Sequence, residues 1–358
     1  MTLLTGIVGA GKVGAIHAQI LASLPESQFV GVCSRTTERA SALAALYNVP
    51  AFDNIEAMID ATGVQSLIIC TPHPVHAANA VPALERGVHV LVEKPLAASL
   101  DDCDRMLQAA ERGGAVLGVI SQRRWLEPAQ RVKAAIESGK MGHPALAVAT
   151  MLSWRDQTYY ESDSWRGRWD TEGGGVLVNQ SPHVLDLLLW YMGEIDTLYG
   201  QWANFNHPYI EVDDTALAVI RFKSGALGSV VVSNSQKPGL YIKVEVHGSS
   251  GASIGVQTEG GAAFIAGMKP ILEPPFNTLW TIPGEESNLP TWRDEDAKFF
   301  QTIDPAAHYF RLQFQDFLEA VQSARVPAVT GLDGRRVVEL FTALYRSQTA
   351  NVPIKFPL

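Results

Sequence analysis

The fold of this protein is decided by the stretch Leu3–Gly14, which reads Leu-Leu-Thr-Gly-Ile-Val-Gly-Ala-Gly-Lys-Val-Gly. A short apolar run that passes directly into closely spaced glycines is typical of a buried strand that ends in a tight turn. Apolar residues then recur at helical spacing through Ala15–Leu21. We therefore predict a first strand over Leu3–Val8, a glycine turn, and a helix behind it.

Each glycine of this turn has its own task in a dinucleotide-binding site. Gly9 allows the tight turn, Gly11 lets a pyrophosphate approach the backbone, and Gly14 lets the helix pack closely on the strand. The N-terminus of the helix attracts the phosphates. The pattern predicts a dinucleotide site that includes Gly9, Gly11, Lys12 and Val13. The alternative is a close-packed turn that binds nothing.

Strands and helices continue to alternate as far as residue 120, which predicts a doubly wound sheet of parallel strands. Ligands of such sheets bind beside the carboxyl ends of the strands. We expect strands over Gln28–Cys33, near Ala51–Phe52, and over Ser66–Cys70, Val88–Val92 and Ala115–Ile120, and helices that begin near Glu38 and cover Ile55–Ala61, Val75–Arg86 and Leu100–Arg112.

The second strand ends in Ser34-Arg35-Thr36-Thr37, where an NAD-preferring site usually has Asp or Glu. A carboxylate there pairs with the ribose 2′-hydroxyl and repels a 2′-phosphate, whereas hydroxyls and a guanidinium favour that phosphate. We therefore predict that Ser34, Arg35 and Thr36 bind NADP(H) in preference to NAD. The alternative is that Ser34 and Thr36 only cap the following helix.

Two further strands end in residues that suit a ligand site. Thr71 and Pro72 follow the strand Ser66–Cys70, and prolines there force an extended loop that can lie against a cofactor. The strand Val88–Val92 ends in Glu93-Lys94-Pro95, which makes Lys94 a candidate for chemistry. The alternative is a lysine that pairs with Glu93 or another carboxylate at the sheet edge.

Length and composition narrow the remaining choices. A chain of 358 residues usually forms two domains, which we expect over 1–122 and 123–358. The net charge of -9 disfavours binding to nucleic acid or to an anionic membrane, and no apolar run approaches the ~18 residues of a membrane span. Three cysteines argue for a reducing compartment, so we expect a cytoplasmic protein.

The alternation of strands and helices stops near Gln122, and strand signals dominate the residues beyond it. These signals predict an open, mostly antiparallel sheet whose free face needs a cover. One long helix is expected over Ala297–Arg325, with Phe310, Phe314 and Phe317 at core spacing. The expected strands are Ala145–Met151, Ala216–Phe222, Ala226–Ser233, Tyr241–Val246, Ala252–Val256 and Val352–Phe356, and the last helix starts at Gly331.

Aromatic and arginine residues are densest between Trp154 and Trp169. Aromatic rings stack on the C–H faces of sugars and arginines bind hydroxyls or carboxylates, so Tyr160, Trp165 and Arg166 suit a carbohydrate pocket. The same composition suits a subunit interface. The residues alone leave both interpretations open.

A second candidate for chemistry follows the triple glycine Gly173–Gly175. Pro182 suits a first helical turn that Ser181 can cap, which puts His183 near a helix N-terminus and Asp186 one turn later. A positive helix end lowers the pKa of a nearby imidazole and favours the neutral form that accepts a proton. Taken alone, such a histidine is more often structural.

Together these motifs resemble the glucose-fructose oxidoreductase and inositol dehydrogenase family, Gfo/Idh/MocA. The resemblance covers nearly the whole chain and implies a Rossmann domain followed by an α+β domain, whose open sheet makes the oligomer contact. The motifs that carry it are Gly9–Gly14, Cys70-Thr71-Pro72 with His76, Glu93-Lys94-Pro95, and the triple glycine followed by Asn179, His183 and Asp186.

The resemblance implies roles for single residues. Lys94 would orient the reacting hydroxyl and ease its proton transfer, and His183 would be the general base for alcohol oxidation or the acid for ketone reduction. Gln122 would face the cofactor. Arg124 would also face the cofactor and is an expected substrate contact, although an interdomain salt bridge explains Arg124 equally well. His76 is expected to be a structural histidine at a helix start.

Asn179 departs from the pattern, because inositol dehydrogenases have Asp at this position. An amide binds a sugar hydroxyl but does not stabilise an imidazolium as an anion does. We therefore expect Asp186 or solvent to support His183. Some sugar-oxidising members of the family are similar in carrying Asn here.

We therefore expect an NAD(P)-dependent oxidoreductase, without a metal, that transfers a hydride to or from a secondary alcohol or ketone carbon of a sugar or cyclitol. It is expected to form a homodimer or homotetramer. Two alternatives stay open, namely a nucleotide-sensing regulatory protein of the same fold and a redox-neutral NAD-dependent glycosidase. The expected substrate contacts are Lys94, Arg124, Tyr160, Trp165, Arg166, Asn179 and His183, and Glu93, Lys94 and Gln122 join the cofactor site.

Overall fold

The computed structural model describes residues 2–260 and 271–358. The chain divides into two units, and each is built from two stretches of sequence. The first unit consists of Met1–Gln122 and Ala306–Val338, and the second consists of Arg123–Pro305 and Glu339–Leu358. The return of Ala306–Val338 to the first unit was not expected from the sequence. None of the helices within the described ranges combines the length and apolar composition that a bilayer-crossing segment requires.

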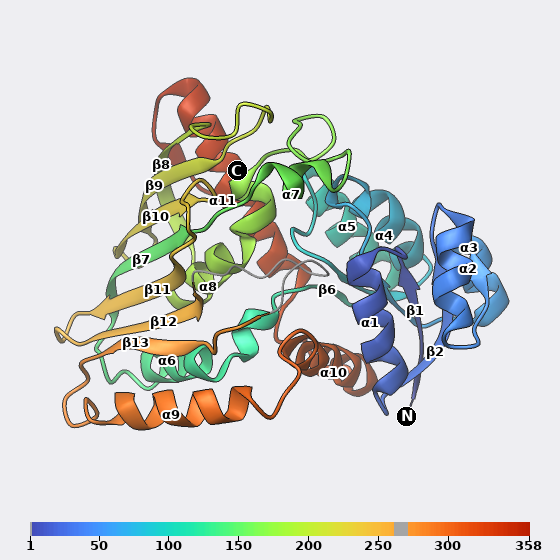
Figure 1. Ribbon diagram of the computed structural model, residues 1–358, viewed down its shortest axis with the longest axis horizontal. Helices are drawn as coiled ribbons and strands as arrows, with labels where there is room; N and C mark the ends of the chain where they lie inside the picture. Colours follow the sequence, from blue (N-terminus) through green and yellow to red (C-terminus); the bar gives the residue numbers. More distant parts are fainter. Residues whose placement is uncertain (1, 261–270) are drawn as a thin grey trace. The chain divides into compact units, whose positions relative to one another are not determined.

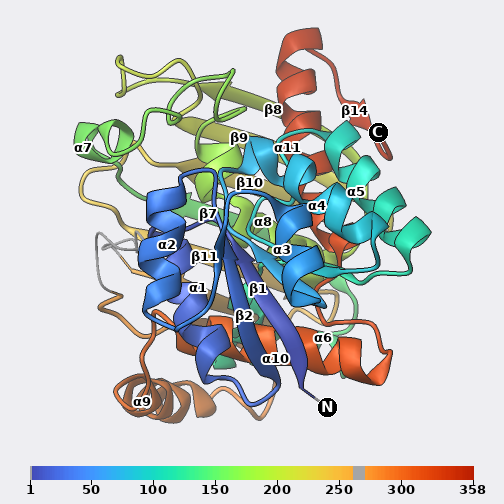
Figure 2. The ribbon, with the colours of Figure 1, turned by 90° about the vertical axis from the view of Figure 1, so that its right-hand side faces the viewer.

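The first unit is built on a six-stranded sheet in the order β3-β2-β1-β4-β5-β6, and all neighbouring strands run parallel. Its strands are β1 Leu3–Val8, β2 Ser27–Cys33, β3 Ala51–Phe52, β4 Ser66–Ile69, β5 His89–Val92 and β6 Leu117–Val119, and its helices include α1 Lys12–Ser23, α2 Thr37–Ala45, α3 Ile55–Thr62, α4 His76–Glu85 and α5 Leu100–Gly113. Helices α1 and α2 lie on one side of the sheet and α3, α4 and α5 on the other (Figure 2). The predicted doubly wound sheet is confirmed.

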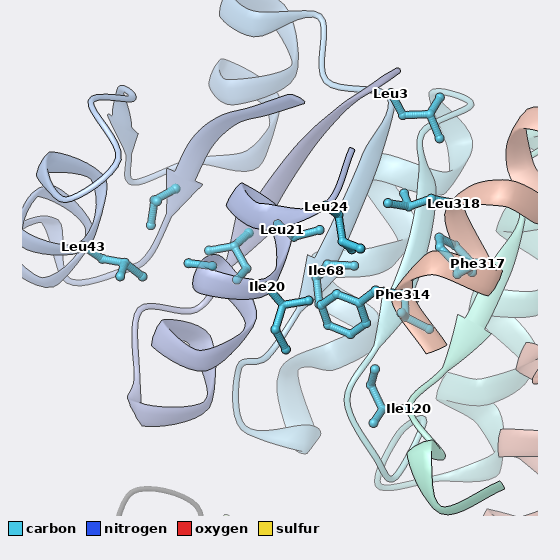
Figure 3. Packing of buried hydrophobic residues seen from close by; sticks show 14 of the residues in the cluster. Leu3, Ile20, Leu21, Leu24, Leu43, Ile68, Ile120, Phe314, Phe317 and Leu318 are labelled. Carbon is cyan, nitrogen blue, oxygen red and sulfur yellow. The ribbon is translucent and has the colours of Figure 1, made fainter. Parts of the chain in front are cut away.

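An apolar cluster fills the space between this sheet and the helices on one of its sides (Figure 3). Ile68 comes from β4 and Leu21 from α1, and neither is more than 1% exposed. Phe314 and Phe317 belong to the same cluster, although they come from α10, His308–Ser323. The late segment of the chain therefore completes the core of the first unit.

The single long helix predicted over Ala297–Arg325 was wrong. The structure has two helices there, α9 Asn288–Phe300 and α10 His308–Ser323. Pro305 lies in the connection between them. Proline has no N–H to donate, and it disfavours helical geometry in the residue before it, which explains the interruption. The predicted last helix is confirmed as α11, Gly331–Ala350.

The second unit is built on an eight-stranded sheet in the order β13-β12-β11-β7-β10-β9-β8-β14. Figure 1 labels the strands of this sheet from β13 to β8. Its strands are β7 Pro144–Leu152, β8 Ile195–Ala203, β9 Thr215–Phe222, β10 Leu227–Ser233, β11 Tyr241–Gly248, β12 Ser253–Glu259, β13 Phe276–Trp280 and β14 Ile354–Lys355, and its helices include α6 Glu127–Glu137, α7 Gln157–Glu161 and α8 Pro182–Met192. β7 and β10 pair in parallel, whereas the other neighbouring strands are antiparallel. The predicted mostly antiparallel sheet is confirmed.

Side chains alternate between the two faces of this sheet. Along β9, residues of one face are buried, while Leu217 and Val219 on the other face are 51% and 59% exposed. Val231 and Leu227 on the neighbouring β10 are also exposed. One face of the sheet thus presents apolar side chains that nothing in the described part of the chain covers.

Candidate functional site

The glycine turn follows β1 and leads into α1. Gly9 has a φ of 112°, and a Cβ there would lie 2.8 Å from backbone atoms of Cys70. A Cβ on Gly14 would lie 2.0 Å from the Gly9 carbonyl oxygen, so only glycine lets α1 approach β1 this closely. By contrast, apart from Gly11 itself and its two chain neighbours, no described residue has an atom within 4 Å of the Cβ position of Gly11, the N-cap of α1. Other protein atoms thus fill the space beside Gly9 and Gly14, whereas the space beside Gly11, next to Lys12, is free.

His76 joins the two loops that follow β4 and β5. Its Nε2 lies 2.9 Å from the Thr71 carbonyl oxygen, and its Nδ1 lies 3.1 Å from the Pro95 carbonyl oxygen. Burial lowers the pKa of His76, although its hydrogen bonds to carbonyl groups act in the opposite direction. His76 is the buried first residue of α4, as expected for a structural histidine at a helix start. The peptide bond between Lys94 and Pro95 is cis.

Both carboxylate oxygens of Glu93 have partners within the first unit. Oε1 lies 2.7 Å from His17 Nε2 on α1, and Oε2 accepts the backbone N–H of Lys94 at 3.0 Å. Burial raises the pKa of Glu93, but the hydrogen bond from His17 and the charges of His17 and Lys94 outweigh it, so the net shift is downward. The His17 ring is fully buried against Phe310 and Phe314.

This pair fixes the backbone from which Lys94 projects. His17 was not identified from the sequence. His17 could have been found as the one polar residue on the otherwise apolar buried face of α1.

Gln122 closes the first stretch of the first unit. Its side-chain Oε1 is buried and has no hydrogen-bond partner among residues 2–260 and 271–358. Buried polar atoms are normally satisfied, so an orphaned acceptor suits a hydrogen-bond donor from a ligand.

The alternative that Ser34 and Thr36 only cap helix α2 is not supported by the hydrogen bonds at the end of β2. Thr36 is the N-cap residue of α2, but its side chain makes no capping hydrogen bond. Ser34 Oγ accepts only a long bond, 3.4 Å, from the Thr36 backbone N–H. Arg35 between them is exposed. The two hydroxyls and the guanidinium are therefore not consumed by the start of the helix.

A carboxylate that was not predicted from the sequence lies near the same strand end. Asp53 directly follows β3, whose Phe52 pairs with Cys33 at the end of β2. Burial raises the pKa of Cys33 to about 11, and the charges of Asp53 and Glu56 contribute to the rise. NAD-preferring sites usually have an acidic residue at the end of β2 itself, whereas this one follows the neighbouring strand β3.

In the second unit, α8 carries His183 in its first turn and Asp186 one turn later. His183 is 8% exposed. The predicted cap was wrong, because the Ser181 hydroxyl makes no capping bond and instead donates to the Leu177 carbonyl oxygen at 2.8 Å. Ser181 has helical backbone angles and directly follows the helical turn Val176–Gln180, so its hydroxyl bonds back to the residue four positions earlier.

Asp186 is held by Arg124 in a buried bidentate pair. Arg124 Nε donates to one carboxylate oxygen at 2.9 Å and Nη2 donates to the other at 2.6 Å. Both residues belong to the second unit, so this salt bridge is not the interdomain bridge that the sequence allowed. The guanidinium also lies over the Trp190 ring, 5.4 Å from its centroid.

Asn179 takes part in a buried hydrogen-bond network. Its Nδ2 donates to Glu172 Oε1 at 2.5 Å and to the Tyr159 hydroxyl at 3.2 Å. The other oxygen of Glu172 accepts the backbone N–H of Gly167. Burial raises the pKa of Glu172 to about 7, and the hydrogen bonds from Gly167 and Asn179 limit the rise. A carboxyl group thus lies beside Asn179. Glu172 was not identified from the sequence, although its position directly before the triple glycine could have indicated it.

The aromatic and arginine stretch packs partly on itself. Arg166 donates to the Tyr159 hydroxyl at 2.5 Å, and its guanidinium lies 4.3 and 4.4 Å from the ring centroids of Tyr159 and Trp165. The buried Tyr160 accepts a hydrogen bond from Asn234 at 2.8 Å. Of the expected substrate contacts in this unit, the structure groups Arg166 and Trp165 with the Asn179 network, whereas Arg124 is paired with Asp186.

The triple glycine is shaped by two residues that were not identified from the sequence. Asp213 accepts the backbone N–H of Gly175 at 2.7 Å and the Tyr345 hydroxyl at 2.6 Å. A Cβ on Gly174 would lie 2.3 Å from that hydroxyl oxygen. Both partners are far from the glycines in the sequence, so no local pattern could have identified them.

Two family models match the chain. The model described as an oxidoreductase family with an NAD-binding Rossmann fold matches residues 3–121, and the model described as a GFO/IDH/MocA C-terminal domain matches residues 129–254. The chain belongs to the Gfo/Idh/MocA family. This confirms the resemblance drawn from the glycine, Glu-Lys-Pro and histidine motifs, and it makes the first unit an NAD-binding Rossmann domain.

Relatives in the Gfo/Idh/MocA family match the chain over almost its full length. A myo-inositol 2-dehydrogenase from Thermotoga maritima is 27% identical over 96% of this chain and 95% of the relative. A scyllo-inositol 2-dehydrogenase (NAD(+)) from Bacillus subtilis is 26% identical over 98% and 95%. The crystal structure of the WlbA dehydrogenase from Bordetella pertussis, in complex with NADH and UDP-GlcNAcA, matches with a TM-score of 0.84 and 26% identity over 100% of both chains.

Proposed function

We propose that this protein is an NAD(P)-dependent oxidoreductase that transfers a hydride between nicotinamide and the secondary alcohol or ketone carbon of a sugar or cyclitol. The match of both units to the Gfo/Idh/MocA family carries the proposal. The inositol dehydrogenases among its full-length relatives support the substrate class.

The residues of the first unit fit a dinucleotide. The open Cβ position of Gly11 leaves room for a pyrophosphate at the N-terminus of α1, where backbone N–H groups and the helix dipole attract phosphate. The orphaned Oε1 of Gln122 suits an amide donor of the cofactor. We propose that Gly9, Lys12, Val13, Thr71 and Pro72 complete this site. When bound, nicotinamide supplies or accepts the hydride.

The chemistry also needs groups that handle the hydroxyl proton. We propose that His183 accepts this proton on an imidazole nitrogen during oxidation and returns it during reduction. The Lys94 ammonium is proposed to donate a hydrogen bond to the same substrate oxygen. Glu93, which bonds to His17 and to the Lys94 backbone, acts by fixing Lys94.

The remaining proposed contacts bind the substrate ring. Asn179, Tyr160, Trp165 and Arg166 are proposed to hold its hydroxyls and C–H faces. Arg124 is proposed to act indirectly, because its guanidinium holds Asp186 on the helix that carries His183.

Within this function, we propose a preference for NADP(H). Ser34, Arg35 and Thr36 offer hydroxyls and a guanidinium to a 2′-phosphate, and the α2 N-cap does not consume them. Asp53 opposes this preference, because its carboxylate near the end of β2 repels the phosphate.

Fluorescence titration with NADPH and NADH tests the preference. We expect Arg35→Ala to weaken NADPH binding by roughly 10-fold and to leave NADH binding nearly unchanged. Asp53→Asn should shift the ratio toward NADPH. A wild-type protein that binds NADH more tightly than NADPH contradicts the proposal.

The function itself is tested by a screen of purified protein with sugars, inositols and ketosugars and each cofactor, with reduced nicotinamide as the readout. Turnover of a secondary alcohol supports the proposal. Cofactor binding without turnover across the screen would favour the regulatory alternative. Glycoside cleavage without net cofactor reduction would favour the redox-neutral glycosidase.

We propose that a second copy of the chain covers the apolar face of the eight-stranded sheet. Leu217, Val219, Leu227 and Val231 expose apolar surface along two neighbouring strands. A contiguous apolar patch on a soluble protein commonly marks an interface. The assembly is proposed to be a homodimer or homotetramer. The three cysteines form no disulfide, which supports the proposed reducing, cytoplasmic location.

A further inference from the structure

Arg155 is a buried cation that has no counter-charge among the residues that the structure describes. It lies just beyond the carboxyl end of β7 and is only 7% exposed. Its Nη1 donates to the Trp154 carbonyl oxygen at 3.0 Å, and the guanidinium carbon lies 5.4 Å from the centroid of the Tyr159 ring. The buried Nε has no hydrogen-bond partner among the described residues. Within residues 2–260 and 271–358, no carboxylate oxygen forms an ion pair with Arg155, and residues 261–270 contain no Asp or Glu.

Three other buried or half-buried arginines of the second unit have acidic partners. Arg124 pairs with both oxygens of Asp186, Arg131 pairs with both oxygens of Asp296, and Arg123 pairs with Glu259. The pair with Asp186 uses the Nε–Nη2 edge of the guanidinium. On Arg155 the Nε of this edge is the atom without a partner.

An unpaired guanidinium is costly at this depth. Arginine does not deprotonate in proteins, so it cannot shed its charge as a buried lysine can. A cation–π contact with Tyr159 offsets only part of the desolvation cost. Burial lowers the pKa of Arg123, Glu259 raises it, and the charge of Arg155 lowers it further, so Arg155 also lies near a second cation. These features are those of a site completed by an anion.

Arg155 belongs to the same network as Asn179. The Tyr159 ring that it faces carries the hydroxyl to which Asn179 donates. The backbone N–H of Arg155 donates to the Asn234 carbonyl oxygen at 2.9 Å. Asn234 binds the Tyr160 hydroxyl, and its own Oδ1 is buried without a partner in the described part of the chain. A cationic donor and a neutral acceptor are therefore left unsatisfied on adjacent residues.

We propose that Arg155 binds the carboxylate of the substrate, which is a sugar acid. The Nε–Nη2 edge matches the two oxygens of a carboxylate, as it does in the Arg124–Asp186 pair. Asn234 Oδ1 accepts a hydrogen bond from a hydroxyl of the same molecule. This inference rests on the proposed oxidoreductase function and names its substrate class.

The test compares sugars that differ only at the charged group. D-glucuronate is compared with D-glucose and with D-glucuronamide, D-galacturonate is compared with D-galactose, and glucose 6-phosphate serves as a phosphoryl probe. Wild type, Arg155→Met and Arg155→Lys are assayed for kcat/KM with both cofactors. Arg346→Met, which removes an exposed arginine of the same unit, is the matched control.

We expect wild type to prefer at least one acid over its neutral counterparts by roughly 10–100-fold, the range of a charge-assisted pair. Arg155→Met should abolish this preference through KM, because kcat/KM falls far more for the acid than for the neutral sugar, and Arg155→Lys should restore part of it. The unfolding temperature of Arg155→Met should equal or exceed that of wild type, because no internal ion pair is lost.

Three results overturn the proposal. One is a wild-type protein that prefers the neutral sugars or glucose 6-phosphate. Another is an Arg155→Met variant that loses acid and neutral substrates in equal measure. The third is a marked fall in its unfolding temperature with unchanged selectivity, which makes Arg155 a structural residue.

The absence of all turnover refutes the proposed function rather than the anion site. In that case, calorimetric titration with D-glucuronate and D-galacturonate decides. Binding by wild type and its loss in Arg155→Met support the site, and no binding of either acid to wild type excludes it.

Discussion

Glu172 supplies the ionisable group that the asparagine at position 179 lacks. An amide alone offers no proton and no charge. The carboxyl group of Glu172, however, lies 2.5 Å from the Asn179 amide nitrogen and has a pKa raised by burial to about 7. This acid is therefore close to half-ionised at neutral pH. The acid–base character that Asn179 lacks is thus present one hydrogen bond away.

The raised pKa of Glu172 predicts a specific dependence of stability on pH. The folded protein retains a proton that the unfolded chain releases above its ordinary pKa of 4.5. Stability from this group is therefore complete below about pH 4.5 and falls by roughly 3 kcal/mol as the pH rises to about 7. Glu172→Gln should remove this dependence. Its unfolding temperature relative to wild type should rise by several degrees between these pH values.

Thermal unfolding at several pH values between 4.5 and 8 is the measurement. Glu211→Gln, which removes an exposed carboxylate of the same unit, should leave the pH profile unchanged. Parallel profiles for wild type and Glu172→Gln would show that Glu172 is ionised throughout.

Residues whose position follows from local spacing were predictable, and those defined by distant contacts were not. Proline at the start of a helix placed His183 near the helix N-terminus and Asp186 about one turn later, and the structure has both there. The pairing of Arg124 with Asp186, and of Gly175 with Asp213, joins segments that are far apart in the sequence. No spacing rule contains that information.

The glycine turn between β1 and α1 offers a pair of matched substitutions. A Cβ on Gly14 meets the Gly9 carbonyl oxygen at 2.0 Å, whereas a Cβ on Gly11 meets no described atom beyond its chain neighbours within 4 Å. Gly14→Ala should destabilise the first unit by several kcal/mol, because backbone must move. Gly11→Ala should leave the unfolding temperature within about 2 °C of wild type and weaken cofactor binding by at least about 10-fold.

Calorimetric titration with the cofactor measures the affinity of each variant, and thermal unfolding measures its unfolding temperature. Unchanged cofactor affinity in Gly11→Ala would mean that no phosphate approaches this turn, and the proposed dinucleotide site would be wrong.

Helices and strands with a regular spacing of apolar residues were predicted well. The points at which a helix is interrupted, and the unit against which it packs, were not. The alternating strands and helices of residues 3–120 were identified because each strand is a short buried run bounded by a turn. The apolar spacing of Phe314 and Phe317 predicted a buried helix face, which the structure confirms. The spacing could not say that this face packs on the sheet of the first unit, because the partner residues lie at the other end of the chain.

The assembly of the whole molecule should depend on the open sheet. Replacing Val219 and Val231 by lysine places two charges on the exposed apolar face of β9 and β10. If a second copy covers this face, the double variant should be monomeric in sedimentation velocity, while the unfolding temperature of each unit changes little. Leu46→Lys on the exposed end of α2 is the control. An unchanged oligomer in the double variant locates the interface elsewhere.

Hydride transfer as proposed requires Lys94 and His183 to act on one substrate hydroxyl. The most direct measurement is kcat for Lys94→Met and His183→Gln with the best substrate of the sugar screen, together with the cofactor dissociation constant. Each variant should lose roughly 10²–10⁴-fold in kcat, while the cofactor still binds. Undiminished turnover in either variant would exclude the role proposed for that residue.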